Sequence, residues 1–121
     1  IDSITVRINL DDSLNLSSII CYNRNVIEGN ALTFYKGERL KEKRNHYNGI
    51  LNGHSHSFYE SGALMTDVFY QQSKPAFYSW EYWDDIYSLT KYVRQYDSDG
   101  KQILIKVFDI KGNFLRDSFP N

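Results

Sequence analysis

The chain has 121 residues, with 14 Lys and Arg against 15 Asp and Glu, and a formal net charge of -1. This balance creates no overall positive field, so we expect no nucleic acid as a partner. The single cysteine, Cys21, excludes an internal disulfide and a cysteine-rich metal site. No apolar run approaches the roughly 20 residues of a membrane-spanning helix, so we expect no membrane span.

Tyr, Phe and Trp make up 16% of the residues, and high Tyr and Phe usage favours strands. Residues 4–10 alternate apolar and polar side chains, which predicts a strand with one buried face that ends in a turn at residues 11–13. Residues 19–22 and 26–27 flank Asn23, Arg24 and Asn25, and this pattern predicts a hairpin because Asn tolerates a left-handed backbone.

An internal repeat follows. Gly29 recurs as Gly53, residues 34–35 (Phe-Tyr) recur as 58–59, and Leu40 recurs as Leu64, all at an offset of 24 residues. A further step of 24 reaches the aromatic pair Tyr82 and Trp83, although Asp84 and Asp85 replace the turn glycine there. In each unit, an aromatic residue packs on a sheet and a polar step supplies the tight turn to the return strand.

Two more units, residues 96–101 and 108–113, carry glycines 12 residues apart and predict successive hairpins. We therefore expect an all-β single domain over residues 1–121, a repeat-like meandering sheet of consecutive antiparallel hairpins with little or no helix. Residues 1–28 are expected to form capping strands, and residues 29–115 to form the aromatic and glycine repeats.

The segment from Gly53 to Leu64, followed by Phe69 and Tyr70, resembles the MORN-variant repeat of YwqK-like antitoxin proteins of bacteria. That repeat reads Gly, four residues, two aromatics, two residues, Gly, one residue, Leu. Residues 29–75 fit it in two copies and residues 76–115 fit it loosely. The resemblance implies a meandering antiparallel sheet and a binding role, in some relatives as the immunity partner of a secreted toxin.

Three other motifs suggest sites but have simpler interpretations. His54 and His56 share one face of a strand and could ligate a metal, but we expect exposed polar residues and no metal, since only His46 offers a third imidazole. Residues 97–100 resemble a calcium loop but lack its later ligands, so we expect a hairpin turn. The basic stretch 36–44 could contact phosphates, yet a solvated edge strand is favoured.

The densest cluster combines four aromatic rings with three carboxylates in residues 80–87. Strand alternation predicts that Trp80 and Tyr82 pack on the sheet, while Glu81, Trp83 and Asp85 point outward. Exposed rings beside carboxylates are typical of contacts with a basic protein partner. The predicted partner-binding residues are Glu81, Trp83, Asp84, Asp85 and Tyr87.

Catalytic motifs are missing from the sequence: it has no G-x-S-x-G elbow and no phosphate-binding glycine loop, so we expect no enzyme and no cofactor. The predicted function is a protein-binding module, most concretely an immunity protein that occludes a toxin. A glycan-binding module with exposed rings, or an accessory domain of a larger surface protein, stays open. No Met opens the chain, so we expect a trimmed start. The compartment stays open: the cytoplasm is slightly favoured, and the periplasm or the cell surface is the alternative if a leader was removed.

Overall fold

The computed structural model describes residues 3–120, and every regular element in that range is a β-strand. The strands are β1 (Ile4–Leu10), β2 (Leu16–Asn23), β3 (Val26–Ile27), β4 (Gly29–Phe34), β5 (Leu40–Tyr47), β6 (Ile50–Leu51), β7 (Gly53–Phe58), β8 (Leu64–Gln71), β9 (Lys74–Tyr82), β10 (Thr90–Tyr96), β11 (Gln102–Phe108) and β12 (Phe114–Ser118).

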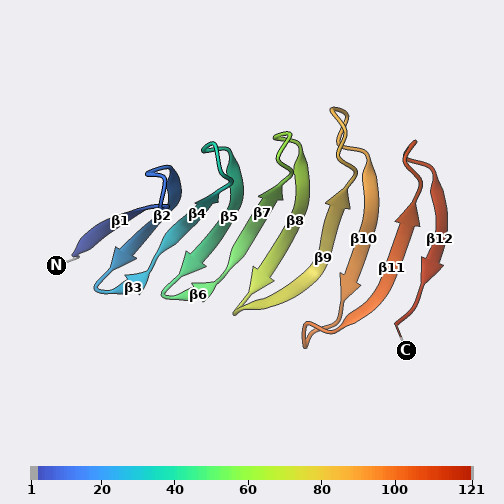
Figure 1. Ribbon diagram of the computed structural model, residues 1–121. Helices are drawn as coiled ribbons and strands as arrows, with labels where there is room; N and C mark the ends of the chain where they lie inside the picture. The colour runs from blue at the N-terminus through green and yellow to red at the C-terminus, as the bar shows by residue number, and fades with distance from the viewer. Residues whose placement is uncertain (1–2, 121) are drawn as a thin grey trace.

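All strands belong to one antiparallel sheet in the order β1-β2-β4-β5-β7-β8-β9-β10-β11-β12, while β3 pairs with β2 and β6 pairs with β5. Apart from the short strands β3 and β6, each strand lies beside the next one in the chain, so β1 and β12 lie at opposite ends of the sheet (Figure 1). This meander confirms the predicted all-β fold of consecutive antiparallel hairpins. Within residues 3–120, no helix is long and apolar enough to cross a membrane.

The 24-residue repeat is visible in the backbone. Phe34, Phe58 and Tyr82 are the last residues of β4, β7 and β9, so the predicted equivalence of these three positions in the backbone is confirmed. Residues with positive φ recur at the same spacing: Leu14, Glu38 and Gly62; Arg24, Asn48 and Gln72; Asn25, Gly49 and Ser73; Gly29, Gly53 and Phe77. These sets extend the repeat into the N-terminal segment, which thus shares the geometry of the following hairpins.

The side chains that open successive turns connect the hairpins along one edge of the sheet. The Tyr35 hydroxyl donates a hydrogen bond to the carbonyl of Phe58 at 2.6 Å, and the Tyr59 hydroxyl donates to the carbonyl of Tyr82 at 2.7 Å. One copy later, Trp83 Nε1 donates to the carbonyl of Asp109 at 2.9 Å. Because equivalent rings reach the next hairpin in the same way, the repeat provides both the register and part of the stability.

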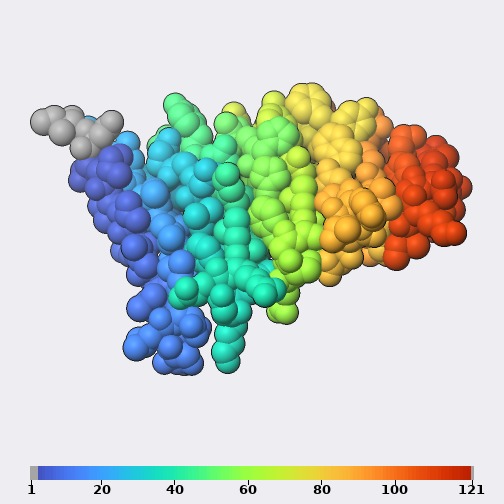
Figure 2. Space-filling view, turned by 90° about the horizontal axis from the view of Figure 1, so that it is seen from above, coloured from blue at the N-terminus to red at the C-terminus, as the bar shows by residue number. Residues whose placement is uncertain are grey.

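The sheet is a single layer, because the main contacts between elements join hydrogen-bonded neighbours. In the described part of the chain, the only buried apolar residue is Val107, and the buried polar residues are Ser55 and Ser79. Figure 2, seen along the sheet from above, shows the elongated body that results. Stability therefore comes from side-chain pairs on adjacent strands and not from an enclosed core.

Two expectations from the sequence are wrong. The apolar face of β1 (Ile4, Val6, Ile8 and Leu10) is exposed, since no second layer covers this edge strand. The basic stretch does not form a sheet edge, because β5 lies between β4 and β7. Its charged side chains fit in the middle of the sheet because both faces of a single layer meet water.

Candidate functional site

The loop between β9 and β10 differs from the equivalent loops of the repeat. In the four other loops on this edge of the sheet, the first residue donates its N–H to the carbonyl four residues later, as Asp11 does to Asn15, and Tyr35, Tyr59 and Asp109 do likewise. In the β9–β10 loop, Trp83 donates instead to Leu89, so this loop is two residues longer. It projects beyond its neighbours at the upper edge of the sheet (Figure 1).

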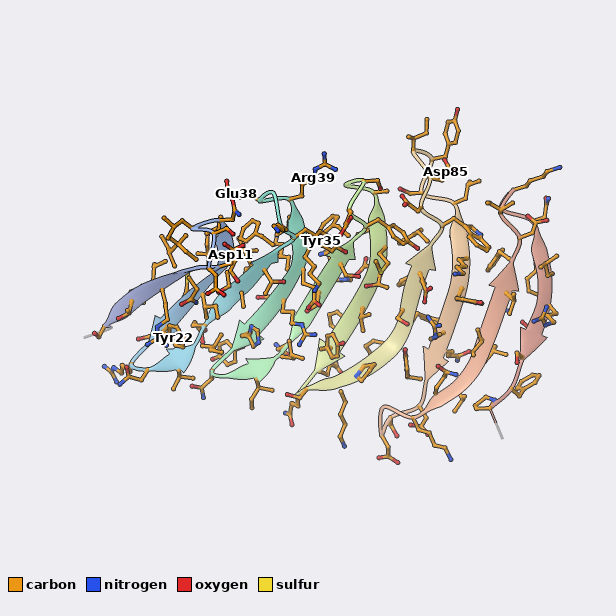
Figure 3. The ribbon with its side chains drawn as sticks, in the orientation of Figure 1. Asp11, Tyr22, Tyr35, Glu38, Arg39 and Asp85 are labelled. Atoms are coloured by element: carbon orange, nitrogen blue, oxygen red, sulfur yellow. The ribbon has the colours of Figure 1, made fainter. Side chains whose placement is uncertain are left out.

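The longer loop has an exposed apolar tip. Ile86 is 88% exposed and Tyr87 is 74% exposed, while Leu14 and Ile110, the single apolar residues in two shorter loops on this edge, are 77% and 61% exposed. The Asp85 carboxylate accepts a hydrogen bond from the backbone N–H of Tyr87 at 2.8 Å, which fixes the turn. Asp85 is labelled in this projecting loop in Figure 3. The tip thus holds a large aliphatic and a large aromatic side chain in water.

Of the predicted binding residues, Glu81 and Trp83 are occupied by contacts within the chain. Glu81 accepts from Arg94 Nη1 at 2.9 Å and has Lys91 Nζ at 3.9 Å. The same Lys91 ammonium lies 4.6 Å from the centroid of the Trp83 ring. The prediction that Trp83 points outward is wrong: its ring is half-buried and donates to Asp109, because β9 ends at Tyr82 and strand alternation stops there.

Asp84 and Asp85 lie at the base of the projecting loop, where they border a hollow on the edge of the sheet. The hollow has a volume of about 640 Å³, and its apolar lining comes from Phe58, Ala63, Leu64 and Ile86. The Asp84 carboxylate accepts from Ser61 Oγ at 2.6 Å, which connects this loop to the preceding one. The structure therefore places an apolar hollow beside two carboxylates.

The base of this region is held by two half-buried tyrosines. Burial raises the pKa of the Tyr59 phenol, and the negative charges of Glu81 and Asp84 add to that effect. Burial also raises the pKa of Tyr82, with a further contribution from Asp67. Both phenols are therefore neutral at physiological pH. Tyr59 can act as the hydrogen-bond donor that holds the base of the loop.

Sequence reasoning missed Ile86, although the 24-residue spacing contains the relevant signal. A copy of the five-residue turn that begins at Trp83 would end two residues before Leu89. The two additional residues within 83–89 indicate an insertion. An apolar residue in an inserted loop segment is a candidate contact residue, since it has no place in the repeat.

The predicted histidine pair lies on one strand face, as expected. The rings of His54 and His56 stack at 6.2 Å with an interplanar angle of 11°. Sequence reasoning missed Asp67, which β8 brings beside them because the register pairs His56 with Asp67. These three side chains form the histidine cluster, and they are the described residues that could hold a metal ion.

The segment at residues 97–100 is a hairpin turn, as predicted. The Asp97 N–H donates to the carbonyl of Lys101, and the Gly100 N–H donates to the carbonyl of Asp97. The Asp97 carboxylate accepts from the N–H groups of Asp99 and Lys101 at 2.9 Å each. The oxygen Oδ1 of Asp97 accepts both bonds and thus stabilises the turn.

No protein-family model matches this chain, and neither a curated protein nor a solved structure matches it.

Proposed function

We propose that the protein is a non-catalytic protein-binding module that contacts a basic partner through the tip of the β9–β10 loop and the hollow beside it. The observation that carries the proposal is that the longer loop holds two exposed large side chains, Ile86 and Tyr87, next to Asp84 and Asp85. Exposed large side chains over an apolar hollow are typical of interface anchors, and carboxylates beside them favour encounter with a positively charged surface.

A non-catalytic role is supported by the single-layer architecture. Enzymes stabilise developing charge most strongly in sites that exclude water. Among residues 3–120, Val107, Ser55 and Ser79 are the buried residues, and they do not form one enclosed site. Cys21 is half-buried within β2. The sheet presents surfaces that suit binding.

A protein partner is favoured over a glycan by the arrangement of the rings. A sugar-binding row would need aromatic rings in parallel planes along a groove, but Tyr78 and Trp80 are tilted by 41°, and Phe69 and Phe77 by 32°. The projecting loop instead offers an acidic and apolar ridge. An immunity protein that occludes a basic toxin is the most concrete form of this proposal, and it follows from the resemblance to the antitoxin repeats.

The proposal is tested by affinity capture and quantitative binding with loop variants. Ile86→Ala with Tyr87→Ala should lower the affinity for the captured partner at least about tenfold, because each anchor contributes on the order of 1 kcal/mol or more. Asp84→Lys with Asp85→Lys should slow association and weaken its salt dependence, since these charges steer a basic partner.

Two matched variants control for general surface effects. Ile110→Ala removes an exposed apolar side chain from the neighbouring loop, and Glu60→Lys reverses a charge in the preceding loop. Both should leave the affinity unchanged. A partner that binds the loop variants as tightly as the wild-type protein would remove this surface from the account.

A further inference from the structure

We propose that His54, His56 and Asp67 form a binding site for a divalent transition-metal ion such as Zn²⁺. The histidine cluster combines two imidazoles with one carboxylate, the nitrogen and oxygen ligands that zinc accepts in proteins. It lies on β7 and β8, apart from the loop proposed to bind a partner. The site is therefore independent of that function.

The ligand atoms already converge. His54 Nδ1 lies 2.9 Å and His56 Nε2 lies 3.5 Å from the same oxygen of Asp67, Oδ1. One ligand atom from each residue lies within 4.8 Å of the other two. Bonds of about 2.0–2.2 Å to a tetrahedral zinc place ligand atoms about 3.3–3.6 Å apart. Small side-chain rotations would thus bring all three onto one ion.

The backbone fixes this arrangement without a loop. Side chains two residues apart on a strand share a face, which places both imidazoles on the same side of β7. The antiparallel register then sets Asp67 directly across from His56. Sites on paired strands are positioned more accurately than sites on loops, because the ladder of backbone hydrogen bonds holds the ligands.

Aromatic rings support one side of the cluster. The Phe69 ring lies 5.0 Å from the ring of His54, and the Phe77 ring lies 6.0 Å from that of Phe69. Phe77 occupies the repeat position of Gly29 and Gly53 with a φ of 60°, a conformation that is costly for a bulky residue. The repeat imposes this backbone conformation, and the Phe77 ring packs against Phe69, which supports the cluster.

Three protein ligands leave at least one coordination position for water or another ligand, as in open zinc sites. The His54 side chain is 56% exposed, so an ion can enter from solvent. Lys43 lies across from His56 on β5, and its positive charge limits the affinity for a cation. The site is thus suited to a reversibly bound ion.

Isothermal titration of the full chain with Zn²⁺ tests the proposal. The wild-type protein should bind one ion, and His56→Ala and Asp67→Asn should each lower the affinity at least about tenfold. His46→Gln is the matched control, because it changes the remaining histidine, on β5, and should leave the affinity unchanged. Circular dichroism establishes that each variant keeps its strands.

Histidine ring ¹⁵N NMR provides a readout that a change in stability alone would not produce. Zn²⁺ should shift the Nδ1 resonance of His54 and the Nε2 resonance of His56, and leave both nitrogens of His46 in place. Folded wild-type protein that shows no saturable binding in millimolar Zn²⁺ would overturn the proposal. Equal affinity in the ligand variants, or shifts confined to His46, would overturn it as well.

Discussion

Removal of the Tyr59 hydroxyl tests how much the contacts between repeats contribute to stability. In Tyr59→Phe the ring stays, but the hydrogen bond of 2.7 Å to the carbonyl of Tyr82 is lost. A typical internal hydrogen bond contributes about 1 kcal/mol net. With an unfolding entropy of about 2.1 cal/mol/K per residue, that loss lowers the melting temperature of a chain of this length by about 4 °C.

The raised pKa of Tyr59 makes the stability difference between the wild type and Tyr59→Phe depend on pH. Because burial raises this pKa in the folded state, the contribution of the phenol to stability is fully present below its unfolded pKa of about 10 and is lost as the pH rises through the folded value. The difference in stability between the wild type and Tyr59→Phe should therefore narrow at alkaline pH.

Urea unfolding followed by far-UV circular dichroism measures both effects. The midpoint should fall while the slope with denaturant stays the same, since the surface exposed on unfolding does not change. Tyr47→Phe is the control, because Tyr47 is 67% exposed and should change stability by less than about 0.5 kcal/mol. A Tyr59→Phe variant that is as stable as Tyr47→Phe would refute the structural role of this bond.

Three further predictions concern single positions of the repeat. Ser73→Gly should stabilise the protein by about 0.5–1 kcal/mol in urea unfolding, because Ser73 has a φ of 67° where the preceding copy has Gly49; lower stability would contradict this. Phe77→Gly should relieve a similar strain and leave the melting temperature unchanged or higher, and a large decrease would show that its ring is needed for stability. Asp109→Asn should make the stability of the protein fall less steeply as the pH falls. Hydrogen bonding from the backbone of Asn113 lowers the pKa of Asp109 in the folded state. The carboxylate therefore stabilises the fold fully above an unfolded pKa of about 4, and this stabilisation is lost as the pH falls through the folded pKa. Melting curves at about pH 5 and pH 2 check this prediction, and parallel pH profiles would contradict it.

The sequence predicted those parts of the fold that depend on local pattern. Alternation located the first strand, Asn and Gly located the hairpins, and the recurrence of Phe34 at Phe58 located the repeat. The first copy escaped notice because Asp11 stands where later copies have Tyr35 and Tyr59. That copy shares backbone geometry with the others, and backbone geometry is not visible in the identity of side chains.

The candidate sites were less predictable because they depend on strand pairing. His54 and His56 were expected on one face, but Asp67 joined them only through the register of β7 with β8. The outward position of Trp83 was expected from alternation, which does not extend beyond the end of β9. A one-residue difference in either place reverses the face of a side chain, so periodicity alone does not decide such sites.

The central structural claim is that the repeat builds one open layer with its ends far apart. Ten strands lie side by side from β1 to β12, so nine spacings of about 4.8 Å separate the two edges by about 43 Å. Spin labels at Thr5→Cys and Arg116→Cys in a Cys21→Ser background report this separation by pulsed electron paramagnetic resonance. An open single layer should give a distance distribution centred at about 40 Å. A distance below about 25 Å would mean that the sheet folds over or closes on itself, and would contradict an open single layer.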